Sequence, residues 1–125
     1  MAPERVRLIP AGELAVGPST PGMMRRQAVV TGRVWAGVVH TEPGAFSGWH
    51  HHGEHESVIY VAAGALRVES GEGGRDVFDA QPGDFVFVPP LSVHREGNIT
   101  EVRATLVVTR SGQGPSVINV EGPAR

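Results

Sequence analysis

Four of the six histidines in this chain lie within seven residues, together with two glutamates. The segment reads Gly44-Ala-Phe-Ser-Gly-Trp-His-His-His-Gly-Glu-His-Glu56, and the isolated His94 follows much later in the sequence. Imidazole and carboxylate groups bind divalent transition metals, and in a β-protein such a site forms when donors converge from separate strands. The pattern therefore predicts a metal site.

The order of the donors indicates which of them could share that site. Alternate side chains of a β-strand lie on one face, so His50 and His52 should point together while His51 points away. Glu56, on a strand that returns after a turn, can supply a carboxylate, and His94 can supply a further imidazole. This donor set suits Fe(II), Mn(II), Zn(II), Ni(II) or Co(II) rather than Cu(I), so we expect one of these ions as cofactor.

Simpler interpretations of the same residues stay open. Histidine runs occur in surface loops, and an isolated histidine such as His94 is most often a hydrogen-bonded structural residue. An expression tag does not account for the run, because the run is internal and strand-like sequence flanks it. The presence of both Glu56 and His94 favours metal binding over these alternatives.

The elements that must position these donors are β-strands, because the chain has little helical periodicity. Short runs rich in β-branched and aromatic residues recur, and turn residues such as Ala63-Gly64 and Pro89-Pro90 separate them. The predicted strands are Val34–Thr41, Phe46–His52, Glu56–Ala62, Ala65–Ser70, Asp76–Phe78, Phe85–Val88, Glu101–Thr109 and Ser116–Val120. Many short, closely spaced strands form a sandwich or barrel, so we predict an all-β fold.

The first part of the chain is less decided. Val6–Ile9 could form a strand, while Gly17–Gly22 has the composition of a loop. A length of 125 residues suits one domain, and no internal repeat suggests a second. We therefore expect a single domain in which residues 1–33 form an N-terminal extension or edge strands and residues 34–120 form the β-barrel.

The composition argues against several classes of partner. The net charge of −2 gives no basic surface for nucleic acid or an anionic membrane, and no apolar run approaches the roughly 20 residues that span a bilayer. The chain has no cysteine, so it has no disulfide framework. Residues 1–7 lack the apolar core of a signal peptide, so we expect a cytoplasmic protein without nucleic acid or membrane partners.

Two motifs in this chain resemble those of the cupin superfamily. The first cupin motif has the form G-x5-H-x-H-x(3,4)-E-x6-G, and Gly44, His50, His52, Glu56 and Gly64 stand in its order. The resemblance implies that these two histidines and this glutamate are metal ligands.

The second cupin motif, G-x5-P-x-G-x2-H-x3-N, is matched at full spacing by Gly83, Pro89, His94 and Asn98. Leu91 stands where this motif has glycine, which would need only a different turn conformation. The resemblance covers residues 34–109 and implies a double-stranded β-helix, the jelly-roll barrel of cupin type, with a metal inside. It also implies a homodimer, with the N-terminal segment as a candidate exchanged strand. Cupin activities are too diverse for the motifs to name a reaction.

The spacing of the first motif leaves its acidic ligand open. Seven residues separate Glu56 from Gly64, one more than in the motif, so counting back from Gly64 puts Ser57 at the acidic position. Either a β-bulge returns Glu56 to the site, or the histidines hold the metal without a carboxylate.

A few other residues could line a pocket. Tyr60 packs more readily in a core, but its hydroxyl could face the cavity as a proton donor, so Glu56 and Tyr60 are the candidate catalytic residues. Arg25 and Arg26 are expected on a solvated edge, with anion binding at the cavity mouth as the alternative. Glu96 closely follows a predicted ligand, yet it is expected to be exposed.

Three protein ligands would leave positions open for a substrate and for water or dioxygen. We therefore predict a metal-dependent enzyme that acts on a small organic molecule. With Fe(II), Mn(II) or Ni(II) it would be a dioxygenase that catalyses oxidative cleavage, and with Zn(II) or Mn(II) an isomerase or lyase. A non-catalytic small-molecule-binding domain is the third hypothesis, because no general base beyond the ligands stands out.

Overall fold

The computed structural model describes residues 2–125, and its regular structure consists almost entirely of antiparallel β-strands. In spatial order, the larger sheet contains β1 (Ala15–Val16), β2 (Met23–Val30), β3 (Val34–Thr41), β10 (Ala104–Ser111), β5 (Glu56–Ala63) and β8 (Phe85–Val88). The smaller sheet contains β11 (Ile118–Asn119), β4 (His50–His51), β9 (His94–Gly97), β6 (Leu66–Ser70) and β7 (Asp76–Ala80). A short 3₁₀ helix, η1 (Ala11–Glu13), precedes β1.

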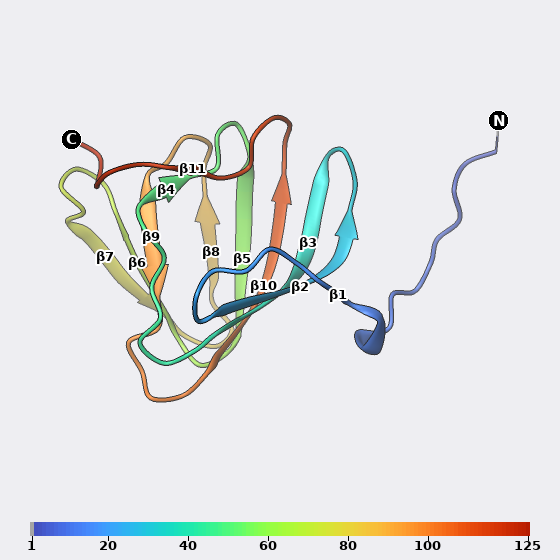
Figure 1. Ribbon diagram of the computed structural model, residues 1–125, viewed down its shortest axis with the longest axis horizontal. Helices are drawn as coiled ribbons and strands as arrows, with labels where there is room; N and C mark the ends of the chain where they lie inside the picture. The colour runs from blue at the N-terminus through green and yellow to red at the C-terminus, as the bar shows by residue number, and fades with distance from the viewer. Residues whose placement is uncertain (1) are drawn as a thin grey trace.

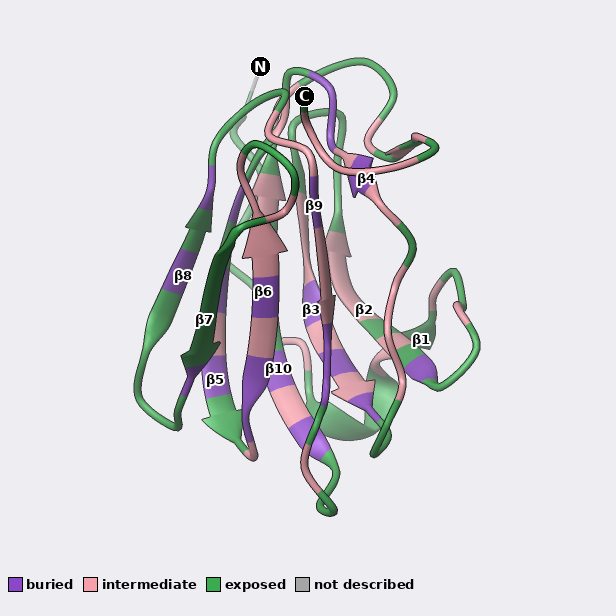
Figure 2. Cartoon of the chain, turned by 90° about the vertical axis from the view of Figure 1, so that its left-hand side faces the viewer, coloured by how far each residue is buried: buried purple, intermediate pink, exposed green. Residues whose placement is uncertain are grey.

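The two sheets pack face to face, as the ribbon in Figure 1 and the side view in Figure 2 show. Alternate side chains of each sheet point into the shared interior, which produces the alternation of buried and exposed residues along the strands. Val39, Val86 and Leu106 of the larger sheet meet Leu66 and Val68 of the smaller one in a single core cluster. This arrangement confirms the predicted all-β jelly roll.

Most strands lie where the hydrophobic alternation predicts them. The predicted bounds of β3 and β8 are those of the structure. The strand expected from residue 101 begins instead at Ala104, because the side-chain amide of Asn98 donates to the carbonyls of Thr41 and Val102 and holds the preceding loop in a turn. Of the strand expected over Phe46–His52, only the two residues of β4 have strand geometry.

Three strands, β1, β2 and β9, were not among those given bounds from the sequence, although edge strands were expected within residues 1–33. β2 pairs with β3 from Met23 opposite Thr41 to Val30 opposite Trp35, so part of residues 1–33 belongs to the larger sheet. β9 follows the Pro89-Pro90 turn and pairs with both β4 and β6.

The N-terminal segment has a different course. Val6 and Leu8 lie outside the sheets, with exposed fractions of 103% and 84%, so the strand considered for Val6–Ile9 does not form. Figure 1 shows this segment running away from the body of the fold. Residue 1 of the predicted N-terminal extension lies outside the described residues. Among the residues that are described, no helix has the length and apolar character needed to span a membrane.

Two turns next to the motif strands use a left-handed backbone. Gly64, between β5 and β6, has φ of 77°, and a Cβ added there would lie 2.7 Å from the Cα of Ala104, so the position requires glycine. Leu91, where the second motif has glycine, has φ of 63° and donates its backbone N–H to Gly53 O at 2.8 Å. The turn therefore keeps a backbone conformation that favours glycine, with a leucine in it.

Candidate metal centre

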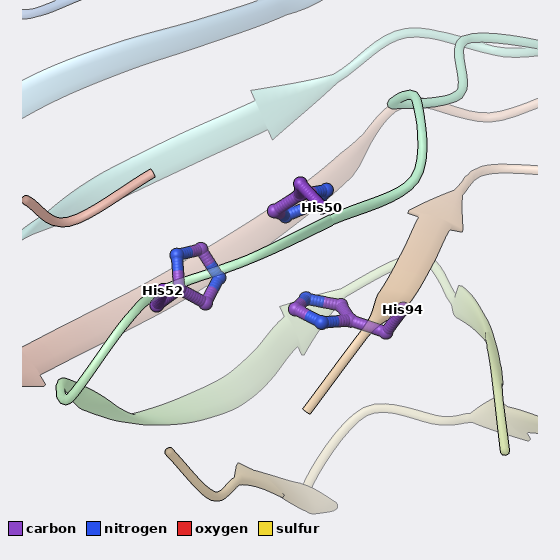
Figure 3. A group of neighbouring side chains, drawn as sticks. All are labelled: His50, His52 and His94. Carbon is purple, nitrogen blue, oxygen red and sulfur yellow. The ribbon is translucent and has the colours of Figure 1, made fainter. Parts of the chain in front are cut away.

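Three histidines gather between the two sheets, around the common space shown in Figure 3. His50 on β4 pairs directly with His94 at the start of β9, and His52 follows β4 two residues after His50. Their exposed fractions are 6% for His50, 4% for His52 and 1% for His94. One nitrogen of each ring lies within 4.8 Å of the others, so the group could hold a metal ion.

The Nδ1 atom of each ring is hydrogen-bonded to a backbone carbonyl. In His50 and His94 the carbonyl belongs to the residue two positions earlier, at 2.9 Å, and in His52 it belongs to Ser116, at 2.7 Å. A carbonyl oxygen only accepts, so each Nδ1 carries a proton, and in the neutral ring Nε2 presents a lone pair. Metal-binding histidines are typically held in this way. The Nε2 atom of His94 is buried without a hydrogen-bond partner, and a metal ion would satisfy it.

A carboxylate adjoins the histidines, but it is not the predicted one. Glu96 places Oε2 3.4 Å from Nε2 of His94 and Oε1 3.8 Å from Nε2 of His50. The Glu96 side chain is 17% exposed and its Oε2 has no hydrogen-bond partner, so the expectation that Glu96 is exposed was wrong. The sequence held the signal, because a residue two positions after His94 on a strand shares its face.

Burial and the neighbouring charges set the protonation of these groups. Burial lowers the pKa of His52 to about 3, and the charge of Arg110 acts in the same direction. Burial also lowers the pKa of His50. At His94 burial has the same effect, but the adjacent carboxylate of Glu96 outweighs it and raises the pKa. At Glu96 burial opposes ionisation, but the histidine rings, His94 foremost, lower its pKa to about 2. His50 and His52 are therefore neutral at neutral pH and able to bind a cation.

The structure does not bring Glu56 into the group. Along β5 the buried positions are Ser57, Ile59 and Val61, so the side chain of Glu56 lies on the exposed outer face. The pairing of β5 with β10 has an irregularity opposite Thr105, at the far end of β5 from Glu56. It therefore does not turn the Glu56 side chain toward the interior. Ser57, 1% exposed, occupies the inward position that spacing from Gly64 had indicated.

Tyr60 lies on the outer face of β5 as well. Its ring packs against that of Phe85, with 4.9 Å between the centroids, and Tyr60 does not line the cavity among the described residues. A proton-donating hydroxyl in the cavity is therefore not what the structure shows. His51 accepts a hydrogen bond from the backbone N–H of Gly53, which accounts for this ring without a metal.

A cavity of about 540 Å³ adjoins the histidines, a volume that suits a small organic molecule. Its wall includes His50, His52, Glu96, Arg25, Trp35 and Arg110. Arg25 is half-buried and faces inward on β2, whereas Arg26 is exposed on the outer face. The solvated edge expected for the arginine pair therefore describes Arg26 alone.

Comparison with known proteins places this geometry in a family. The sequence model of the Cupin domain matches residues 37–110, which is more than half of the chain. A search of curated proteins gave no match. The structure is similar to an uncharacterized conserved protein with a double-stranded β-helix domain from Klebsiella pneumoniae, with a TM-score of 0.74, 21% identity, and 94% of this chain and 99% of that chain covered.

Two further solved structures are similar. KdgF from Halomonas sp. has a TM-score of 0.73 and 23% identity, with 86% of this chain and 96% of that chain covered. An oxalate decarboxylase of Lactobacillus farciminis has a TM-score of 0.71 and 19% identity, with 87% of this chain but 34% of that chain covered. At these identities the likeness shows the fold alone. The family model matches residues 37–110, and the two antiparallel sheets and the two motifs agree with that match. The chain belongs to the cupin family.

Proposed function

We propose that this cupin binds one divalent transition metal ion through the Nε2 atoms of His50, His52 and His94. The observation that carries the proposal is the hydrogen bonding of all three Nδ1 atoms to backbone carbonyls, which leaves three Nε2 lone pairs in one buried space. Imidazole donors accept Fe(II), Mn(II), Zn(II), Ni(II) and Co(II). Closed structural zinc sites use four protein ligands, often cysteines, and this chain has no cysteine.

Glu96 takes the place that the sequence motif gives to Glu56. Two donors bound about 2.1 Å from one ion lie about 3.0 Å apart at octahedral and about 3.4 Å apart at tetrahedral angles, and Glu96 Oε2 lies 3.4 Å from His94 Nε2. Both of these atoms are buried and lack hydrogen-bond partners, so an ion between them would satisfy both.

The function supported best is that of a metal-dependent enzyme for a small organic molecule, and our first candidate is a dioxygenase that cleaves its substrate oxidatively. The ion, when bound, would supply Lewis acidity or, if redox-active, a position for dioxygen. The histidines would hold the ion, and the cavity beside them would orient the substrate and limit its contact with water.

One observation favours an isomerase or lyase as the second candidate. Glu96 borders both the histidine Nε2 atoms and the cavity, where its carboxylate could accept a proton from a bound substrate. The third candidate is a domain that binds its ligand without turnover.

One experiment separates these candidates. The metal content of the purified protein is measured first, and the metal-loaded protein is then incubated with small enolic, aromatic and sugar acids with and without oxygen. Turnover in air alone supports the dioxygenase, and turnover in both conditions supports the isomerase or lyase. Metal-dependent binding without turnover supports the binding domain. A protein that takes up none of the five ions would contradict the metal site itself.

We further propose a cytoplasmic protein, as the sequence predicts, that forms a homodimer, as the resemblance to cupins implies. Val6 and Leu8 are apolar and exposed, and they support exchange of the N-terminal segment between two copies. Covering such side chains with a partner removes apolar surface from water, which stabilises the dimer. Light scattering of the full chain and of a Val6→Ser, Leu8→Ser variant would test this proposal.

A further inference from the structure

Two half-buried guanidinium groups, those of Arg25 and Arg110, face the cavity beside the histidines. Arg25 extends from β2 and Arg110 from the end of β10, two strands that both neighbour β3. Each lies on the inner face of its strand, because Met23 and Leu106, which share those faces, belong to the buried core. Both arginines line the cavity together with His52 and Glu96.

Neutral groups hold the two arginines in place. Arg110 donates from Nε to the hydroxyl of Ser57 at 3.1 Å, and its guanidinium carbon lies 5.9 Å from the ring centre of Trp35. Arg25 donates from Nη1 to the hydroxyl of Thr20 at 3.1 Å and to Pro18 O at 3.4 Å. Among residues 2–125 no hydrogen bond is made by Nη1 or Nη2 of Arg110, or by Nε or Nη2 of Arg25. Each guanidinium group is thus held in place and still has N–H groups free to bind a ligand.

These cations also lack counter-ions. Within the described chain no carboxylate lies within 4.0 Å of Arg25 or Arg110, although Arg67, Arg95 and Arg103 each have such a partner. Burial lowers the pKa of both cavity arginines, which reflects the cost of removing their charge from water. Of the described residues that line the cavity, three are arginines (Arg25, Arg110 and the exposed Arg33) and one, Glu96, is a carboxylate, and a divalent metal would add to the positive excess. A partly buried excess of this kind calls for an anionic ligand.

The shape of the site indicates which anion fits. Between the arginines and the core, a recess of about 30 Å³ is lined by Arg25, Arg110, Ser57, His52 and Glu96. One bound water needs about 10–15 Å³ of such space, so the recess has room for about two water-sized atoms. The flat carboxylate fits a recess of this size more closely than a tetrahedral phosphate with four oxygens, and guanidinium forks bind carboxylates in their own plane.

We propose that Arg25 and Arg110 bind the carboxylate of a small organic acid in this cavity. The acid's second oxygen donor then reaches the metal held by His50, His52 and His94, a part of the inference that rests on the proposed function. The substrate class is accordingly a small carboxylic acid with a further oxygen donor, rather than a neutral molecule or a phosphate ester.

The test compares matched variants of the full chain. Malonate, its neutral isostere malonamide and inorganic phosphate are titrated into zinc-loaded and metal-free protein by calorimetry. Malonate affinity should fall about 10- to 100-fold in Arg25→Gln and in Arg110→Gln, the loss expected for a charge-assisted hydrogen bond. The control Arg26→Gln, on the outer face of the same strand, should bind malonate as the wild type does. Malonamide should bind the wild type at least about 100-fold more weakly than malonate.

Several results would overturn the inference. Equal malonate affinity in Arg25→Gln, Arg110→Gln and Arg26→Gln would remove both arginines from the site. Tighter binding of phosphate than of malonate would refute the carboxylate assignment. Circular dichroism checks that each variant folds, and if Arg110→Gln does not, Arg25→Gln and the charge-retaining Arg110→Lys decide the question.

Metal content, measured on the same samples, separates this inference from the proposed function. Full metal occupancy without arginine-dependent malonate binding refutes the inference and leaves the metal site standing. Arginine-dependent malonate binding in a protein that takes up no metal supports the anion site and refutes the metal site.

Discussion

His94 and Glu96 project from the same face of β9, with Nε2 of His94 3.4 Å from Oε2 of Glu96. Both atoms are buried, and neither has a hydrogen-bond partner. In most buried polar pairs such atoms are satisfied by each other or by water. A cation bound by both would explain why the fold keeps these two donors facing one another in its interior.

The first prediction concerns this carboxylate. Glu96→Gln should weaken metal affinity roughly 10- to 100-fold, because the variant loses a negative donor next to the histidines. The control is Glu56→Gln, which changes the carboxylate of the sequence motif on the exposed face of β5 and should leave affinity unchanged. Competition with a coloured chelator measures both variants. A larger effect at Glu56 than at Glu96 would restore the motif glutamate as the ligand.

The second prediction concerns the histidines themselves. His94→Ala should leave the site largely empty, because it removes one of three imidazole donors. His51→Ala should keep the metal, because the His51 ring is bound by the backbone N–H of Gly53 and is not part of the group. Elemental analysis of both proteins, with circular dichroism as the check on folding, makes the comparison. Full occupancy in His94→Ala would remove that residue from the ligand set.

The third prediction is the acid sensitivity of the metal-free protein. The pKa of His52 is lowered to about 3 in the folded state, so between about pH 6.5 and pH 3 the unfolded chain binds more protons at this residue. Glu96, with a pKa of about 2, adds a loss of stability below about pH 4.5. The raised pKa of His94 acts in the opposite direction, because its stabilising contribution is present at low pH and is lost as pH rises.

The pKa values of His50, His52 and Glu96 are all lowered and that of His94 alone is raised, so the free energy of unfolding should fall by on the order of 2 kcal/mol from pH 7 to pH 4. Urea unfolding across this range measures the slope. His52→Gln should show a shallower slope than the wild type, since it removes the titrating ring. Identical slopes in the two proteins would show that His52 is not buried as a neutral group.

The fourth prediction concerns the turn after β8. Leu91 has φ of 63° and is 64% exposed. Its left-handed backbone is therefore unfavourable, and its side chain contributes little stabilisation by burial. Leu91→Gly should raise the free energy of unfolding by about 0.5–1 kcal/mol. Leu91→Ala, which keeps a Cβ at the same φ, should give no such gain. Thermal unfolding of the three proteins decides between relief of strain and an effect of side-chain size.

The sequence by itself determined most of the strands and the three histidines. Alternation of apolar residues defined β3 and β8 at their observed bounds. Because side chains repeat every two residues along a strand, His50 and His52 had to share a face. The spacing of the second motif singled out His94, and the structure places it opposite His50.

The tertiary structure alone decided which charged groups join these histidines. A shift of one residue in phase turns a strand's side chains to the opposite face, so only the packing of β5 could place Ser57 inside and Glu56 outside. Arg25 and Arg110 come from opposite ends of the sequence and meet because β2 and β10 both pair with β3. A local pattern fixes which residues lie on the same face. Which face is buried, and which distant strand lies across from it, depends on pairings that no local pattern contains.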